Sequence, residues 1–174
     1  ASSFMLGQAP PCESDLGKFH SVLRHMLLAH AEAYHAIHDA LGRNRTRSAH
    51  KVGTVKDINY FQAYNEKSAK DKNEASFLHQ FYNASYFDAL KTGNAIPPMG
   101  NGEHIDIVKN AWDFLGFNYY SRTLVRVGTE EFLHEDKSLT RKDSLGVTDM
   151  GYEIYPRGIY RVIKWLKEYK KPIY

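Results

Sequence analysis

Residues 113–122, D-F-L-G-F-N-Y-Y-S-R, restrict the fold of this chain more than any other stretch. The apolar run at 114–117 is too short for a helix and is typical of a strand that is buried on both faces. Hydrogen-bonding side chains follow at once, beginning with Asn118 and ending with Arg122. In parallel α/β proteins, ligands bind at the carboxyl ends of such strands. The segment therefore predicts a buried parallel strand followed by residues that face a ligand.

Amphipathic helices alternate with the predicted strands. Apolar residues recur at three- and four-residue spacing within 16–41, within 70–90 and in a helix that begins at Pro156 and is ended by Lys171-Pro172. A second short strand is predicted at 52–55, and residues 173–174 have the character of a third strand that is only beginning. This order indicates βαβ units and a parallel sheet. Two strands and the start of a third cannot close a barrel, so the predicted α/β architecture is incomplete.

The composition excludes several classes of protein. The chain has 174 residues, of which 43% are apolar and 25% charged, as in an ordinary globular domain. A net charge of +3 is too small to indicate nucleic acid as a partner, and no apolar run is long enough to span a membrane. The single cysteine, Cys12, allows no internal disulfide and fits a reducing compartment, so we expect a cytoplasmic protein. We expect no cofactor and no metal.

Four segments carry a more specific signal. They are G-Q-A-P-P at 7–11 with the helix L-L-A-H-A-E-A-Y-H-A-I at 27–37, K-V-G-T-V-K-D-I-N-Y-F at 51–61, D-F-L-G-F-N-Y-Y-S-R at 113–122, and D-M-G-Y-E-I-Y-P-R-G-I-Y-R-V-I-K-W-L-K-E at 149–168 followed by K-P-I-Y. In this order they resemble family 1 glycoside hydrolases, the β-glucosidase and β-galactosidase type of (β/α)8 TIM barrel. The resemblance implies a partial barrel from about helix four to the start of strand seven. Residues 1–174 would then be a single segment of one glycosidase domain, incomplete at both ends.

The same resemblance implies that both catalytic groups lie outside this chain. In the family, the acid/base glutamate lies in N-E-P, which would fall just before Ala1, and the nucleophile lies in I-T-E-N-G, which would follow Tyr174. Retaining hydrolysis needs both carboxyl groups, about 5 Å apart. The parent protein would be a retaining β-glycosidase that acts on β-linked glucosides or galactosides without a metal. The isolated segment would be inactive.

Four residues match positions of the family's cleft. Asn118 and Tyr120 correspond to N-Y-Y, where the tyrosine hydroxyl binds the nucleophile carboxylate and keeps it ionised and oriented. Asn59, or Asp57, matches the polar position after strand five that faces the cleft. The chain departs from the family pattern at Asp57, where Asn is usual, and at Tyr152, which replaces the Trp of M-G-W-E. These departures leave the preferred sugar open.

Two other interpretations remain. Glu32 with His35 and Glu131 with His134 are both Glu-x-x-His, the spacing found in di-iron four-helix bundles. The predicted strands argue against a bundle. Alternatively, the chain is a noncatalytic half-barrel that associates with itself or with the remaining barrel segments, because exposed sheet edges and one-sided helices favour association.

Overall fold

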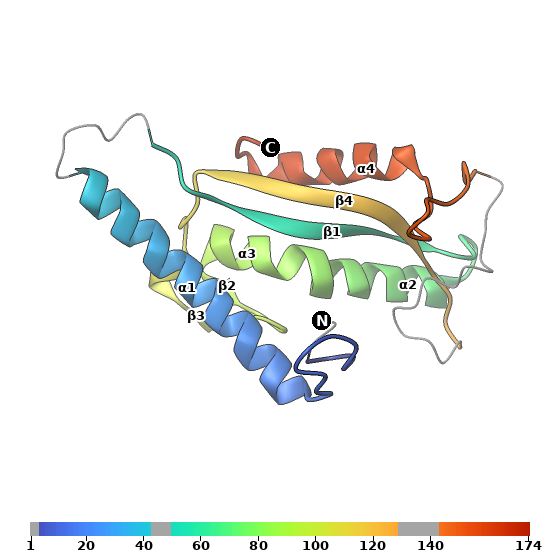
Figure 1. Ribbon diagram of the computed structural model, residues 1–174, viewed down its shortest axis with the longest axis horizontal. Coiled ribbons are helices and arrows are strands. Elements are labelled where there is room, and N and C mark those ends of the chain that lie inside the picture. The colour runs from blue at the N-terminus through green and yellow to red at the C-terminus, as the bar shows by residue number, and fades with distance from the viewer. Residues whose placement is uncertain (1–3, 43–49, 129–142) are drawn as a thin grey trace. The chain divides into compact units, whose positions relative to one another are not determined.

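A computed structural model describes residues 4–42, 50–128 and 143–174, and helices and strands alternate along them (Figure 1). The main helices are α1 (Leu16–Gly42), α2 (Ala69–Leu78), α3 (Ser85–Thr92) and α4 (Pro156–Leu166). The strands are β1 (Gly53–Ala63), β2 (Asn94–Ala95), β3 (Glu103–His104) and β4 (Phe114–Val125). Short helical segments are η1 (His79–Ala84), η2 (Asp106–Val108) and η3 (Lys167–Tyr169). The chain forms two compact units. One comprises Ala1–Thr54 and Ser85–Phe114, and the other comprises Val55–Ala84 and Leu115–Tyr174.

β1 and β4 form a parallel pair of strands, which lie side by side in Figure 1. The Asp113 N–H donates to the Val52 carbonyl at one end of the pair (2.7 Å), and the Tyr64 N–H donates to the Val125 carbonyl at the other end (2.8 Å). Residue numbers rise together along the two strands, which defines parallel pairing. Leu115 pairs in parallel with Ile173, so the predicted third strand does begin beside β4.

Both predicted strands are longer in the structure than their apolar runs indicate. Asp57 and Asn59 lie within β1, and Asn118 and Tyr120 lie within β4, so none of the four comes after a strand end as predicted. The reason is the period of two residues in a strand, which lets polar side chains alternate with buried ones such as Ile58. A search for a continuous apolar run detects only the part of a strand that is covered on both faces.

The predicted helix at 70–90 is present, but a π-helical segment, η1, separates α2 from α3. The helix begins where the Ser68 side chain accepts the Asp71 N–H, which is an N-terminal cap. A π-helical turn inserts one extra residue into the helix and frequently occurs at functional positions. Here η1 supplies two side chains that bind β1, as described below.

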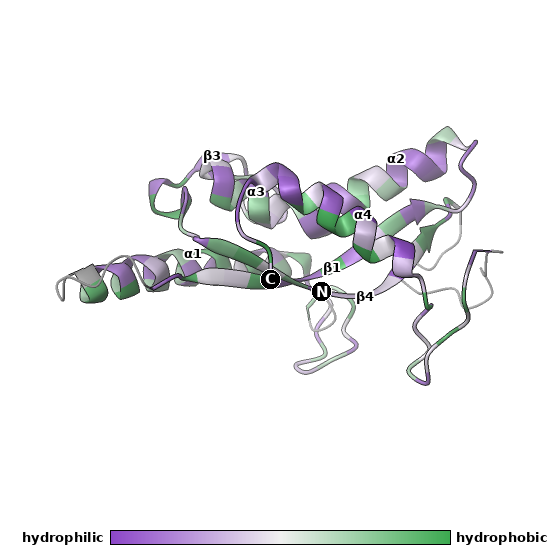
Figure 2. Ribbon diagram, turned by 90° about the horizontal axis from the view of Figure 1, so that it is seen from above, coloured by the Kyte–Doolittle hydropathy of each residue, from purple (hydrophilic) through white to green (hydrophobic). Residues whose placement is uncertain are grey.

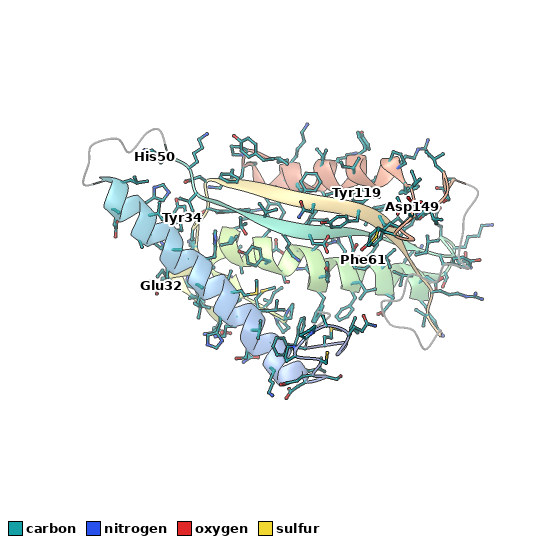
Figure 3. All side chains as sticks on the ribbon, in the orientation of Figure 1. Glu32, Tyr34, His50, Phe61, Tyr119 and Asp149 are labelled. Atoms are coloured by element: carbon teal, nitrogen blue, oxygen red, sulfur yellow. The ribbon has the colours of Figure 1, made fainter. Side chains whose placement is uncertain are left out.

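The core of the second unit lies between the β1–β4 sheet and its helices. Phe61 of β1, labelled in Figure 3, is buried in one cluster with Ala75 and Leu78 of α2 and Val125 of β4. Figure 2 shows α2 and α4 on the same side of the two strands. The helices of this unit therefore cover one face of the sheet.

In the first unit, the carboxylate of Asp113 joins three segments. It accepts hydrogen bonds from the Tyr34 hydroxyl (3.0 Å) and from His38 Nε2 (2.8 Å), both on α1, and from the Val52 N–H (2.8 Å). Burial by itself would raise the pKa of Asp113, but these donors outweigh it and hold the pKa below its usual value. Asp113 thus fixes α1 and the chain before β1 next to the start of β4.

Candidate functional site

The exposed face of β4 carries two of the predicted site residues. Asn118 is exposed, and the Tyr120 side chain is 55% exposed. Between them, Tyr119 points the other way, because its hydroxyl donates to the Tyr155 carbonyl (2.8 Å) and its ring lies against Gly158 of α4. Asn118 and Tyr120 therefore share the face of β4 that is turned away from α4.

Tyr120 has an aromatic neighbour that comes from the segment before α4. The rings of Tyr120 and Tyr152 are stacked, with centroids 5.8 Å apart and planes at 28°. Offset stacking of this kind is favourable for two phenol rings. Tyr152 therefore lies against one face of the Tyr120 ring.

On β1, the carboxylate of Asp57 is turned toward the helical segment η1. Its Oδ2 accepts a hydrogen bond from the Tyr82 hydroxyl (2.9 Å), and its Oδ1 is buried without a hydrogen-bond partner among the described residues. This is not the exposed position expected of a residue that lines a cleft. The Nζ of Lys56 lies 4.4 Å from the centroid of the Tyr82 ring, and burial lowers the pKa of Lys56 to about 8. Burial and the Asp57 charge raise the pKa of Tyr82.

Asn59 is held through its backbone. The side-chain amide of Asn83, which is fully buried in η1, accepts from the Asn59 N–H (3.2 Å) and donates to the Asn59 carbonyl (2.7 Å). The same amide group also lies 3.1 Å from His79 Nδ1. One side chain therefore satisfies both backbone groups of a predicted site residue, in the way that a neighbouring strand would.

Arg122 is the centre of a buried ionic cluster at the carboxyl end of β4. Its guanidinium makes five hydrogen bonds, to the carboxylates of Glu153 and Asp143 and to the side-chain carbonyl of Gln62. The ring of Tyr155 covers it, with 3.7 Å from Cζ to the ring centroid. Burial by itself lowers the pKa of Arg122, but the two carboxylates outweigh this effect and raise it.

The four predicted residues therefore have different surroundings. Asn118 and Tyr120 share one exposed face, Asn59 is fixed by Asn83, and Asp57 is bonded to Tyr82. A common cleft formed by all four stays a prediction.

Sequence reasoning missed two residues that support the site, Asn83 and Glu153. It placed a third, Arg122, among the side chains that face a ligand, and this was wrong, because the Arg122 side chain is fully buried. Asn83 was visible only as part of an Asn-x-Ser sequence, and no local pattern shows that its amide reaches β1. Arg122 and Glu153 both lie in the quoted motifs, but their pairing joins segments far apart in the chain. The only available signal was the charge of Arg122 within a strand whose other residues are uncharged.

The di-iron alternative gains no support from the described residues. Glu32 lies on α1, where it is labelled in Figure 3, and His35 Nε2 on the same helix is bonded to the Ile107 carbonyl (2.8 Å). Glu131 and His134 lie outside the described residues. Within residues 4–42, 50–128 and 143–174, no three His, Cys, Asp or Glu side chains are placed to hold a metal ion.

None of the helices in these ranges combines the length and apolar character needed to cross a bilayer.

Known proteins match most of this chain. The family model described as glycosyl hydrolase family 1 matches residues 1–174. The 1,4-β-D-glucan glucohydrolase of Thermotoga neapolitana is 29% identical over 179 residues, which cover 94% of this chain and 39% of that protein. Beta-glucosidase A of Thermotoga maritima is 28% identical, covering 97% of this chain and 38% of the relative. A β-galactosidase of Sulfolobus acidocaldarius is also 28% identical, covering 86% of this chain and 30% of its own length.

Solved structures give the same result. The Thermotoga maritima family 1 glycoside hydrolase complexed with a cyclophellitol analogue superposes with a TM-score of 0.77 and 26% identity, covering 98% of this chain and 39% of that structure. The β-glucosidase of the same organism with castanospermine gives a TM-score of 0.74 and 27% identity. The chain thus spans about 39% of the length of these relatives. The predicted fold class, part of a (β/α)8 barrel, is confirmed.

Proposed function

Because this chain belongs to glycosyl hydrolase family 1, we propose that it is the middle part of a retaining β-glycosidase that hydrolyses β-linked glucosides or galactosides. The observation that carries the proposal is the family match over all 174 residues. Relatives named as a glucohydrolase, a β-glucosidase and a β-galactosidase support the range of substrates.

In this proposal, Tyr120 acts on the nucleophile. A retaining glycosidase needs one ionised carboxylate to attack the sugar and one protonated carboxyl group to donate to the leaving oxygen. A phenol that donates a hydrogen bond to the nucleophile stabilises its ionised form and lowers its pKa. Tyr120 and Asn118 lie on the exposed face of β4, where such a carboxylate can approach them.

The two catalytic carboxyl groups come from sequence outside these 174 residues, so the chain alone is inactive. The described carboxylates around β1 and β4 have other partners. Glu153 and Asp143 are bonded to Arg122, and Asp57 is bonded to Tyr82. A carboxylate held by a buried guanidinium is not free to attack a sugar.

The test compares the 174-residue chain with a version extended at both ends to the length of its relatives. Both are assayed on 4-nitrophenyl β-D-glucoside and β-D-galactoside. We expect hydrolysis only by the extended protein, release of the β-anomer first as followed by proton NMR, and no loss of rate in a metal chelator. Hydrolysis by the 174-residue chain itself would contradict the proposal, and so would initial release of the α-anomer.

A second function is favoured by one observation on α4. Ile159, Tyr160 and Ile163 are 41%, 65% and 36% exposed, which is high for apolar residues of an amphipathic helix. The isolated chain would then be a noncatalytic half-barrel that associates with itself. Sedimentation velocity over a wide range of concentration distinguishes the two states, because a monomer keeps one sedimentation coefficient and an associating chain does not.

A further inference from the structure

The stacked pair of Tyr120 and Tyr152 needs something that holds Tyr152 in place. Tyr152 belongs to the segment 143–155, which contains Asp149, labelled in Figure 3, and has little regular structure. Its own backbone forms a small antiparallel hairpin, with a bridge between Val147 and Glu153 and with hydrogen bonds from the Ile154 N–H to the Gly146 carbonyl (2.8 Å) and from the Thr148 N–H to the Tyr152 carbonyl (2.8 Å). These bonds order the segment internally, but they do not attach it to β4, where the Tyr120 ring lies.

Arg122 supplies the missing restraint, because it binds this segment near both ends. Two of its donors bind the Asp143 carboxylate at 3.1 Å each, and two others bind the carboxylate of Glu153, the residue next to Tyr152. The Arg122 side chain is fully buried, and the Glu153 side chain is only 14% exposed. The donors of a guanidinium have a rigid planar arrangement, so two carboxylates bound to it are fixed relative to each other.

We propose that Arg122 is a positioning residue: by binding Asp143 and Glu153, it holds the segment 143–155 so that the ring of Tyr152 lies against Tyr120. The Arg122 side chain does not touch a substrate or the reacting atoms. Its effect on the reaction passes through Tyr152 to the orientation of the Tyr120 hydroxyl, and this last step rests on the function proposed above.

The first test measures the geometry in the 174-residue chain itself. Light-driven oxidation with a ruthenium complex and persulfate couples tyrosine rings that are in contact, and peptide mass spectrometry quantifies the link between Tyr120 and Tyr152. At a temperature well below the melting point of every variant, we expect Arg122→Met and Arg122→Lys to reduce this link about fivefold or more. Glu153→Gln, which keeps the size of the side chain, should give an intermediate loss.

Arg24→Met is the matched control, because Arg24 pairs with Glu103 in the other compact unit. It should leave the link unchanged. If Arg122→Lys and Glu153→Gln melt at lower temperature but keep the wild-type yield of the link, Arg122 has only a structural role and the proposal is overturned. Should Arg122→Met fail to fold, these two milder variants still decide the outcome.

The second test uses the extended protein and asks whether Arg122 acts through Tyr120. Arg122→Lys should lower kcat several-fold when Tyr120 is present and have little further effect in the Tyr120→Phe background. Equal effects in both backgrounds would overturn the proposal. Absence of any activity in the extended protein would instead contradict the proposed function, while the cross-link still reports on the role of Arg122.

Discussion

The side chain of Asn83 is completely buried, and its amide makes hydrogen bonds through both its oxygen and its nitrogen. The partners are the backbone groups of Asn59, so removal of the amide leaves two backbone groups unpaired inside the protein. An unpaired buried group costs about 1–3 kcal/mol. A polar residue can therefore stabilise this core more than an apolar one of similar size.

We predict that Asn83→Leu lowers the free energy of unfolding by about 2–4 kcal/mol, because it removes two backbone partners and adds no compensating bond. Urea titration followed by circular dichroism measures the change. Asn118→Leu is the control, since Asn118 is exposed on β4 and its loss should change the free energy by no more than about 0.5 kcal/mol. Equal effects of the two substitutions would contradict the role given to Asn83.

Lys56, in contrast to Asn83, is a polar residue whose burial destabilises the folded state, because burial lowers its pKa from 10.5 to about 8. Below that value, Lys56 is charged in both states and its desolvation destabilises the folded one. Between the two values the unfolded chain binds the proton and the folded chain does not, so stability rises with pH. We predict that Lys56→Met raises the free energy of unfolding by about 1–2 kcal/mol near pH 7.

The gain from Lys56→Met should shrink as the pH is raised toward 10, because the wild-type folded state then escapes the charge penalty. Urea titrations at both pH values measure this trend. The control is Lys164→Met on the exposed side of α4, which should give no comparable gain in the free energy of unfolding. A gain that grows with pH would contradict the assignment.

At the scale of elements, α4 is placed against β4 through Gly158. A Cβ atom at this position would collide with the hydroxyl of Tyr119, which itself is bonded to the Tyr155 carbonyl. We predict that Gly158→Ala lowers the melting temperature and reduces the free energy of unfolding by about 1–3 kcal/mol, although alanine is the better helix former. Gly17→Ala, in the first turn of α1, meets only the Asp15 side chain at 3.2 Å and should be close to neutral.

The start of β4 joins α1 and β1 through Asp113. Its pKa is lowered, so the stabilisation is present above the usual aspartate value and is lost as the pH falls through the folded-state pKa. We predict that Asp113→Asn costs about 1–3 kcal/mol at pH 7 and that the cost disappears in acid. Asp106→Asn, whose side chain is 98% exposed, is the control for thermal melts at both pH values.

Much of this arrangement can be read from the sequence, and the part that cannot has a physical reason. Helix spacing and the apolar runs at 52–55 and 114–117 predict the order of elements, because amphipathic periodicity is local information. The parts of β1 and β4 in which polar residues alternate with buried ones contain no continuous apolar run, so the predicted strands end too early. Contacts such as Asn83 with Asn59 or Arg122 with Glu153 join distant segments, and composition does not encode them.

At the scale of the whole molecule, different groups of polar residues lie along the β1–β4 pair. Asp113 and Val52 lie at the amino ends, where their bonds hold the elements together. Asn118, Tyr120 and Arg122 lie further along, within β4, which runs from Phe114 to Val125. In (β/α)8 enzymes, the carboxyl ends of the strands carry the active site and the amino ends carry stability. We expect the same division in this chain, with Asp113 serving stability and Tyr120 serving the reaction.

Tyr120→Phe in the extended protein tests this division where chemistry would occur. Without the hydroxyl, the nucleophile carboxylate loses a hydrogen bond to its ionised form, so its pKa rises. We predict that the acid limb of the kcat/KM profile moves up by about 1 pH unit or more, with a loss of about tenfold or more in kcat/KM at neutral pH. Tyr152→Phe keeps the stacked ring and should leave the acid limb in place. An acid limb that stays fixed in Tyr120→Phe would show that Tyr120 does not bind the nucleophile, whatever the overall loss in rate.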